Sequence, residues 1–281
     1  MCSSDLKSAV RELPFSVAQG LAAKHGISPD KLLKSMGNRL TERERLRVAG
    51  RSDTVEVRPE KLSLTELASY VLGVETPRDE IGWLASSARA VLARSGPLPL
   101  TGRVAAVLDN SFSSSGSREK RRRPLAVAWG VDQLLREGLA DHDYRAFWTH
   151  PIAEGEVPHP RGQTNLTERL IDALDWGATT VLVVSDGVEN DPPGVFHAVL
   201  EGASRIVPEL YVLHFNPVFD PQELQVSSLS PLTRSIGLRN AEDLPTALGF
   251  ARYVTGHGDL AELEAYLERR VRDFLEGTGH A

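Results

Sequence analysis

Oxygen-bearing side chains occur in three separate segments of the chain, each beside a stretch typical of a buried strand or a helix start. Asp109, Ser111 and Ser113 follow one apolar run. Thr164 precedes a helical pattern, and Asp186 follows a second apolar run. Carboxylate and hydroxyl oxygens suit hard divalent cations, and Mg²⁺ suits a site with few direct protein ligands because it keeps several waters. The sequence therefore predicts a metal site, with Mg²⁺ favoured and Mn²⁺ or Ca²⁺ as alternatives.

The elements that would position these residues alternate between strands and helices after about residue 100. Strand-length apolar runs cover 103–108, 144–149, 180–185 and 210–215, helical patterns cover 124–137, 166–175 and 195–206, and a short strand at 235–238 and helices at 243–253 and 260–274 would follow. This alternation predicts a mainly parallel, Rossmann-like sheet flanked by helices. Ligands bind beyond the carboxyl ends of such strands, so Asp109, Thr164 and Asp186 should meet at one edge.

Residues 1–95 instead show short helical patterns. Their start signals are Ser28-Pro29 and two pairs with capping-box spacing, Thr41 with Glu44 and Ser63 with Glu66. The segment Ser95-Gly96-Pro97-Leu98-Pro99 cannot continue a helix. We therefore expect a small all-α domain over residues 1–95 and an α/β domain over residues 100–281.

Composition limits the function classes. The net charge of −6 argues against non-specific binding of nucleic acid by the whole molecule. Cys2 is the single cysteine, which excludes intramolecular disulfides and cysteine-based zinc sites and favours a reducing, cytoplasmic setting. No apolar run reaches the roughly 18–20 residues of a membrane helix, and the N-terminus lacks a secretion-signal pattern, so we expect no membrane association.

Three motifs, read together, resemble the metal-ion-dependent adhesion site (MIDAS) of von Willebrand factor type A (vWA) domains. They are Asp109-x-Ser111-x-Ser113, Gly162-Gln163-Thr164-Asn165-Leu166 and Ser185-Asp186-Gly187. The resemblance covers about residues 100–255. It implies that Ser111, Ser113 and Thr164 touch the metal and that both aspartates act through water. It further implies a protein partner whose Asp or Glu completes the coordination.

The sequence departs from the vWA pattern at two places. Phe112 stands where a small residue is common, and the basic run Arg118-Glu119-Lys120-Arg121-Arg122-Arg123 precedes the helix at Pro124. Catalysis is not indicated, because Ser111 lacks a Gly-x-Ser-x-Gly turn and no phosphate-binding Gly-rich loop with lysine occurs. We therefore expect a non-enzymatic, metal-dependent protein-binding module.

An alternative from a different class is an RNA-associated protein. Helices leading into a vWA-like domain are similar in outline to the Ro autoantigen (TROVE-type) family, whose helical part binds small RNAs. In this chain the RNA would contact the cluster Arg43, Arg45, Arg47 and Arg51 or the basic run 118–123. Each candidate metal ligand also has an ordinary interpretation, since carboxylates and hydroxyls commonly cap strands and helices.

Overall fold

The computed structural model describes residues 13–36, 39–49, 55–74, 80–117, 121–153, 155–218 and 227–256, and single residues between 258 and 275. The chain divides into two compact units, residues 1–62 and 63–281. In the part of the chain that is described, no helix is both long and apolar enough to cross a membrane.

The first unit contains helices in the segments that carried helical signals. They are α2 (Phe15–Lys24), α3 (Pro29–Met36), α4 (Glu42–Ala49) and the short 3₁₀ helix η2 (Pro59–Lys61). The core joins Phe15 and Ala18 of α2 to Leu32 and Leu33 of α3. The capping box at α4 is confirmed: Thr41 N donates to Glu44 Oε2 at 2.9 Å, and Glu44 N donates to Thr41 Oγ1 at 3.3 Å.

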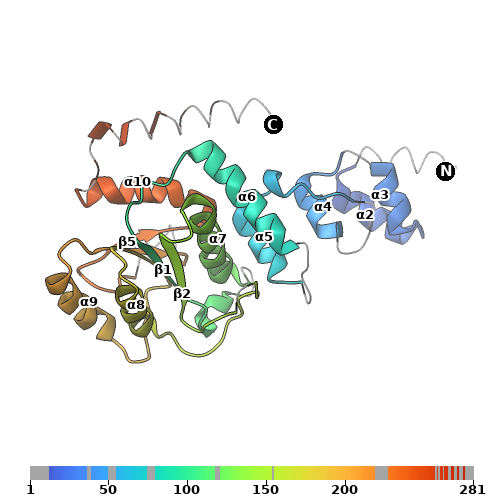
Figure 1. Cartoon of the computed structure of the whole chain (residues 1–281). Helices are drawn as coiled ribbons and strands as arrows, with labels where there is room; N and C mark the ends of the chain where they lie inside the picture. Colours follow the sequence, from blue (N-terminus) through green and yellow to red (C-terminus); the bar gives the residue numbers. More distant parts are fainter. Residues whose placement is uncertain are drawn as a thin grey trace. The chain divides into compact units, whose positions relative to one another are not determined.

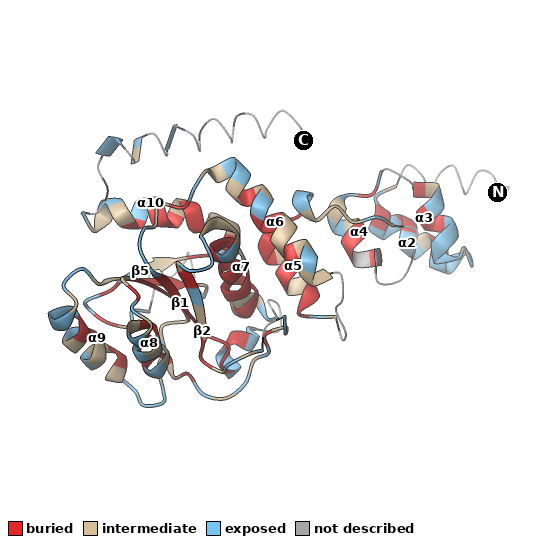
Figure 2. Cartoon of the chain, in the orientation of Figure 1, coloured by how far each residue is buried: buried red, intermediate tan, exposed pale blue. Residues whose placement is uncertain are grey.

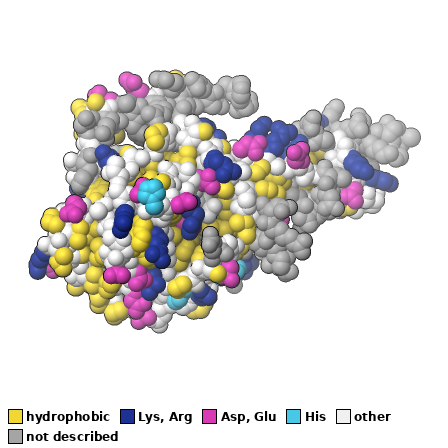
Figure 3. Space-filling model, in the orientation of Figure 1, with side chains coloured by type: hydrophobic (Ala, Val, Ile, Leu, Met, Phe, Trp, Pro, Cys, Tyr) yellow, Lys and Arg dark blue, Asp and Glu magenta, His cyan; other side chains and the backbone are white. Residues whose placement is uncertain are grey.

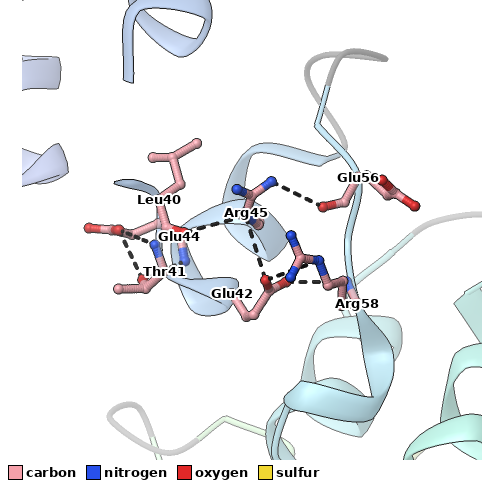
Figure 4. A network of polar contacts seen from close by, with 7 residues as sticks. All are labelled: Leu40, Thr41, Glu42, Glu44, Arg45, Glu56 and Arg58. Carbon is pink, nitrogen blue, oxygen red and sulfur yellow. Dashed lines mark hydrogen bonds and ion pairs between the residues drawn. The ribbon is translucent and has the colours of Figure 1, made fainter. Parts of the chain in front are cut away.

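Arg45 is a structural residue of this unit (Figure 4). It is only 9% exposed, and its Nε donates to Leu40 O at 3.3 Å. Its guanidinium also lies 3.6 Å from Glu42, whose carboxylate accepts a hydrogen bond from Arg58 N at 3.2 Å. The guanidinium of Arg45 therefore holds the start of α4 to the segment before η2.

The second unit is built on one parallel sheet. In the described residues its strands are β1 (Val104–Leu108), β2 (Tyr144–Trp148), β3 (Thr180–Val184), β4 (Tyr211–Asn216) and β5 (Arg234–Gly237), in the order β2-β1-β3-β4-β5. Every neighbouring pair is parallel. The predicted α/β class, with a parallel sheet flanked by helices, is confirmed.

Helices cover both faces of the sheet (Figure 1). They are α7 (Arg123–Gly138), α8 (Leu166–Asp175), α9 (Val195–Ile206) and α10 (Leu244–Val254). The sequence also predicted a helix over 260–274, and the described residues there, such as Leu260 and Leu267, are helical. One core cluster packs Val107 and Val183 against Leu170 of α8 and Phe196 of α9. Figure 2 shows the central strands and most of α7 as buried. Burial on both faces explains why β1 is apolar throughout and why β3 is apolar from Val181 onward.

The division between the two units lies earlier than the boundary that the sequence indicated near residues 95–99. Helices α5 (Leu64–Val71) and α6 (Glu80–Ser95) pack against α7 and belong to the second unit. Leu64, Leu67 and Leu84 are fully buried there. Helical periodicity identifies a helix, but it does not say which core receives the apolar face.

A single carboxylate attaches α5 to the segment before α10. Glu242, in the 3₁₀ helix η4 (Ala241–Asp243), accepts hydrogen bonds from Thr65 N at 3.1 Å, from Thr65 Oγ1 at 2.8 Å and from Ser63 Oγ. Thr65 Oγ1 in turn accepts from Ala241 N at 2.7 Å. Free N–H groups at a helix N-terminus favour an acidic partner, so Glu242 serves as a cap supplied from another part of the chain.

Replacing Glu242 by alanine should lower the free energy of unfolding of the second unit by about 1–3 kcal/mol, because Thr65 loses a charged acceptor. Urea denaturation followed by circular dichroism measures the change. Glu201→Ala is the control, since among the described residues Glu201 pairs with the exposed Arg205 alone, and it should change stability by less than about 0.5 kcal/mol. Equal effects of the two substitutions would contradict the capping role.

Candidate metal site

The two candidate carboxylates lie at the ends of adjacent strands. β1 and β3 pair in register, with Leu108 opposite Val184, and Asp109 N donates to Val184 O at 3.0 Å. Asp109 is therefore the first residue after β1, and Asp186 follows Ser185 after β3. Asp109 is 4% exposed, whereas Asp186 is half-buried.

The three candidate hydroxyls form a hydrogen-bonded chain. Thr164 Oγ1 donates to Ser111 Oγ at 2.9 Å, and Ser111 Oγ lies 3.1 Å from Ser113 Oγ. Ser111 N donates to Asp109 Oδ1 at 2.8 Å, which links the hydroxyls to the first carboxylate. Ser111 and Thr164 are buried, and Ser113 is exposed to solvent.

A small cavity joins these groups to the second carboxylate. Asp109, Ser113 and Asp186 line it together, and its volume of about 10 Å³ leaves room for one water-sized occupant. The structure thus brings all five predicted residues together: three line the cavity, and Ser111 and Thr164 adjoin it through the hydroxyl chain. Among the described residues that line the cavity there is no lysine, arginine or histidine.

Thr164 reaches the site because its loop runs alongside the residues that follow β1. Arg161 N donates to Asn110 O at 2.8 Å, and Phe112 N donates to Gly162 O at 3.1 Å. Thr164 is also bonded to the loop after β3, since its N donates to Asn190 Oδ1 at 2.9 Å. The three motif segments are therefore held to one another by backbone bonds as well as by side chains.

Several residues that hold this site were missed by the sequence analysis. Asn110 is fully buried, and its Oδ1 accepts from Thr149 Oγ1 and His150 N, both at 2.8 Å. Asn216 Nδ2 donates to Asp186 O at 3.0 Å. Their positions in the sequence could have indicated this role. Asn110 lies two residues after the end of β1, and Asn216 is the last residue of the neighbouring strand β4. Side-chain amides at such strand ends commonly bond the backbone of loops.

Glu189 is a further missed residue, and it connects two helices to the loop that carries Asp186. Its Oε1 accepts from Thr167 N in the first turn of α8, and its Oε2 accepts from Phe196 N in the first turn of α9, both at 2.9 Å. A carboxylate that caps two helix N-termini is favoured by the dipoles of both. Sequence spacing gave no hint of this contact, because it depends on how α8 and α9 pack.

The electrostatics of the site favour a positive charge. Burial raises the pKa of Asp109 above its usual value and the nearby Asp186 adds to that, while bonds from Ser111 partly oppose it. In the described ranges, no three His, Cys, Asp or Glu side chains gather to form a metal site on their own, so a site here depends on hydroxyl oxygens. The donor set is all oxygen, which is the chemistry of Mg²⁺, Mn²⁺ or Ca²⁺.

The chain departs from the vWA pattern at Phe112 and in the basic run 118–123, and the structure describes Phe112 and part of that run. Phe112 is 67% exposed, so its ring does not occupy the site. Residues 118–120 of the basic run lie outside the described residues. Arg122 Nη1 donates to Leu72 O, and Arg123 Nη2 donates to Arg239 O at 3.3 Å. These two guanidinium groups are therefore used in part to hold the second unit together.

Comparison with known proteins adds no relative: no family model matches the chain, and no curated protein matches it at a significant level. The fold is that of a Rossmann-like α/β unit, with oxygen-bearing side chains gathered at the carboxyl edge of a parallel sheet.

Gly162→Ala should disturb the loop that carries Thr164. Gly162 has a φ of +64°, and an added Cβ would overlap the ring of His150, whose Nε2 lies 2.9 Å from Gln163 O. Gly194→Ala is the matched control, because its φ is +79° but nothing lies within 4 Å of an added Cβ. Urea unfolding should show a loss for Gly162→Ala that exceeds the control by at least about 1 kcal/mol. Equal losses would mean that only backbone strain matters.

His214 should make stability depend on pH. It is fully buried, its Nε2 lies 3.0 Å from Ser185 O and so donates, and its Nδ1 accepts from Ser235 Oγ at 2.7 Å. Burial lowers its pKa from 6.5 to about 4, although the Ser185 backbone and Asp186 oppose the shift. The unfolded state therefore binds the extra proton first as pH falls below 6.5, and stability decreases with falling pH down to about 4.

This contribution amounts to about 2–3 kcal/mol between about pH 7 and pH 4.5. Urea denaturation across that range should show a flatter stability profile for His214→Asn than for the wild-type chain. His142→Asn, at a side chain that is 83% exposed, serves as the control and should leave the profile unchanged. A wild-type slope retained by His214→Asn would rule His214 out as the source.

Proposed function

We propose that this chain is a non-catalytic, divalent-metal-dependent protein-binding module, with a vWA domain preceded by N-terminal helices. Its MIDAS would consist of Asp109, Ser111, Ser113, Thr164 and Asp186. Mg²⁺ is the favoured ion, with Mn²⁺ or Ca²⁺ as alternatives. The ion would be presented to an Asp or Glu side chain of a partner protein.

The spacing of the hydroxyl oxygens is the observation that carries this proposal. Six oxygens at about 2.0–2.1 Å from Mg²⁺ form an octahedron whose neighbouring oxygens are about 2.8–3.0 Å apart. The distances Thr164 Oγ1 to Ser111 Oγ and Ser111 Oγ to Ser113 Oγ are 2.9 and 3.1 Å. The hydroxyls therefore already have the mutual separation that ligands of one small ion require.

The charges at the site support the same assignment. Asp109 and Asp186 line one cavity, and none of its described lining residues is basic, so the two carboxylates repel each other where Asp109 is poorly hydrated. A divalent cation removes this repulsion. Since hydroxyls are neutral, an ion that they hold directly keeps much of its charge and attracts an anionic group from outside.

Access to the site fits a partner that arrives from solution. Ser113 is exposed and Asp186 is half-buried, whereas Ser111 and Thr164 are buried. The ion would therefore be held from below and open toward Ser113. Phe112, beside it, offers an exposed aromatic ring to the same partner.

The RNA-binding alternative has no comparable support. Arg45 is buried in its own unit, Arg51 lies outside the described residues, and only the backbone of Arg47 is described. Arg122 and Arg123 bond to backbone carbonyls. The geometry therefore favours the metal-dependent module.

Mn²⁺ binding, followed by electron paramagnetic resonance of the free ion, tests the metal site. The wild-type chain should bind one equivalent, which Mg²⁺ displaces. Asp109→Asn and Thr164→Val should each weaken binding at least about tenfold, because each removes a ligand or its support. Thr179→Val, at the opposite end of β3, is the matched control and should bind normally.

The same proteins, used as bait with Mg²⁺ or with EDTA, test the binding role. Partner capture should require Mg²⁺ and should fail for Asp109→Asn and Thr164→Val while Thr179→Val retains it. A wild-type chain that binds no Mn²⁺ would overturn the metal site. Capture that is undiminished by EDTA and by both variants would overturn the adhesion mechanism.

A further inference from the structure

Strand β2 forms one edge of the sheet in the described part of the chain. Two bonds to β1 fix which backbone groups it uses: Val104 N donates to Asp143 O at 2.8 Å, and Thr149 N donates to Leu108 O at 2.9 Å. Backbone groups alternate in direction along a strand, so those of Arg145 and Phe147 also face β1. The N–H and C=O groups of Tyr144, Ala146 and Trp148 therefore face away from the sheet.

A cavity of about 360 Å³ runs along this free edge. Four consecutive residues of β2, 145–148, line it together with Ile152 and with Trp176, which follows α8. The rings of Phe147 and Trp176 lie 6.4 Å apart and tilted. This edge therefore presents unpaired backbone groups beside an aromatic surface, which is a template for another strand.

Side chains of both charge signs lie along the edge, and two of them form no ion pair with a described residue. Arg145 and Asp175 both line the cavity and are exposed, and neither forms an ion pair with a described residue. The guanidinium of Arg145 lies 5.4 Å from the ring centroid of Phe147. Figure 3 shows acidic and basic side chains interspersed with hydrophobic ones over β2 and α8. A patch that carries both charge signs and an apolar centre is self-complementary, as a two-fold interface requires.

We propose that the free edge of β2 binds a second copy of this chain. The two β2 strands would pair antiparallel about a two-fold axis at Ala146, joining the two sheets into one. In that register Ala146 exchanges both hydrogen bonds with the partner's Ala146, and Tyr144 pairs with the partner's Trp148. Arg145 then opposes the partner's Phe147, which repeats between the copies the contact that the two residues make within one chain.

An exposed arginine on an edge strand usually prevents pairing with another strand, but this register avoids that effect. Two arginines would repel if they faced each other, but the two-fold axis at Ala146 places an aromatic ring opposite each one. Cation–π contacts of this kind contribute about 0.5–1 kcal/mol at exposed sites. The small side chain of Ala146 on the axis allows close approach. The short strands favour a reversible dimer.

Antiparallel pairing has a consequence for the candidate site. The carboxyl ends of the two half-sheets point in opposite directions, so the two copies of the site lie at opposite ends of the joined sheet. Such a dimer is bivalent and could bridge two partners. The dimer itself does not depend on the proposed metal function.

Sedimentation equilibrium of the full chain over a range of concentrations tests the proposal. The wild-type chain should dimerise reversibly. Ala146→Pro removes an outward N–H and spares the bonds to β1, as proline on an edge strand allows, and should weaken the dimer at least tenfold. Ala146→Ser keeps both the N–H and a small side chain and is the matched control. A chain that stays monomeric at millimolar concentration, or a dimer that Ala146→Pro leaves intact, overturns the proposal.

If Ala146→Pro does not fold, substitutions of Arg145 and Asp175 that change their charge test the same interface. Arg145→Glu makes the patch acidic on both copies and should also weaken the dimer at least tenfold. The double variant Arg145→Glu with Asp175→Arg restores the charge balance but not the cation–π contact with the partner's Phe147, and should recover part of the lost affinity. Arg205→Glu, on α9, makes the same charge change elsewhere and should have no effect. Equal dimer affinity for Arg145→Glu and wild type would contradict the interface.

Discussion

The parallel pairing of β1 with β3 is the constraint on which the rest of the site depends. Leu108 lies opposite Val184, and the bond from Asp109 N to Val184 O continues the ladder beyond the strand end. This register fixes Asp109 and Asp186 at one edge, each on the first loop residues after a buried strand. A shift of one residue would turn both carboxylates to other faces, because side chains alternate along a strand. The hydroxyls converge only because this pairing already defines the edge.

The sequence correctly predicted the strands and the helices of the α/β unit, and the five residues that it named as candidate ligands lie close together. The physical reason is that β1 and β3 are buried on both faces and so are almost wholly apolar, and polar residues directly after them must lie at the sheet edge. The contacts that hold the ligands were not predictable in this way. The side chains of Asn110, Glu189 and Asn190 bond to residues that lie 7 to 40 positions away in the sequence, and only packing brings these partners near. The assignment of α5 and α6 failed for the same reason, because Leu64 and Leu84 could have served either core.

The polar groups of the candidate site lower the stability of the fold. Asp109 is almost fully buried beside Asp186, and three hydroxyls that could have been apolar side chains bond mainly to one another. Such an arrangement costs stability, since a buried carboxylate is poorly solvated. Asn110, Asn190 and Asn216 offset part of the cost by fixing the loops through neutral amides. These amides hold the loops without adding a charge to the site.

The polar anchors also hold the loops that carry the candidate residues to the sheet. The buried ring of His214 bonds the backbone of Ser185, next to Asp186, and the hydroxyl of Ser235. An apolar residue there would leave Ser185 O and Ser235 Oγ without these partners, and a permanent cation would place a second buried charge near Asp186. A neutral imidazole satisfies both neighbours without neutralising the carboxylate that lines the cavity. Neutral groups therefore fix the loops, and the charge of the described cavity lining comes from Asp109 and Asp186.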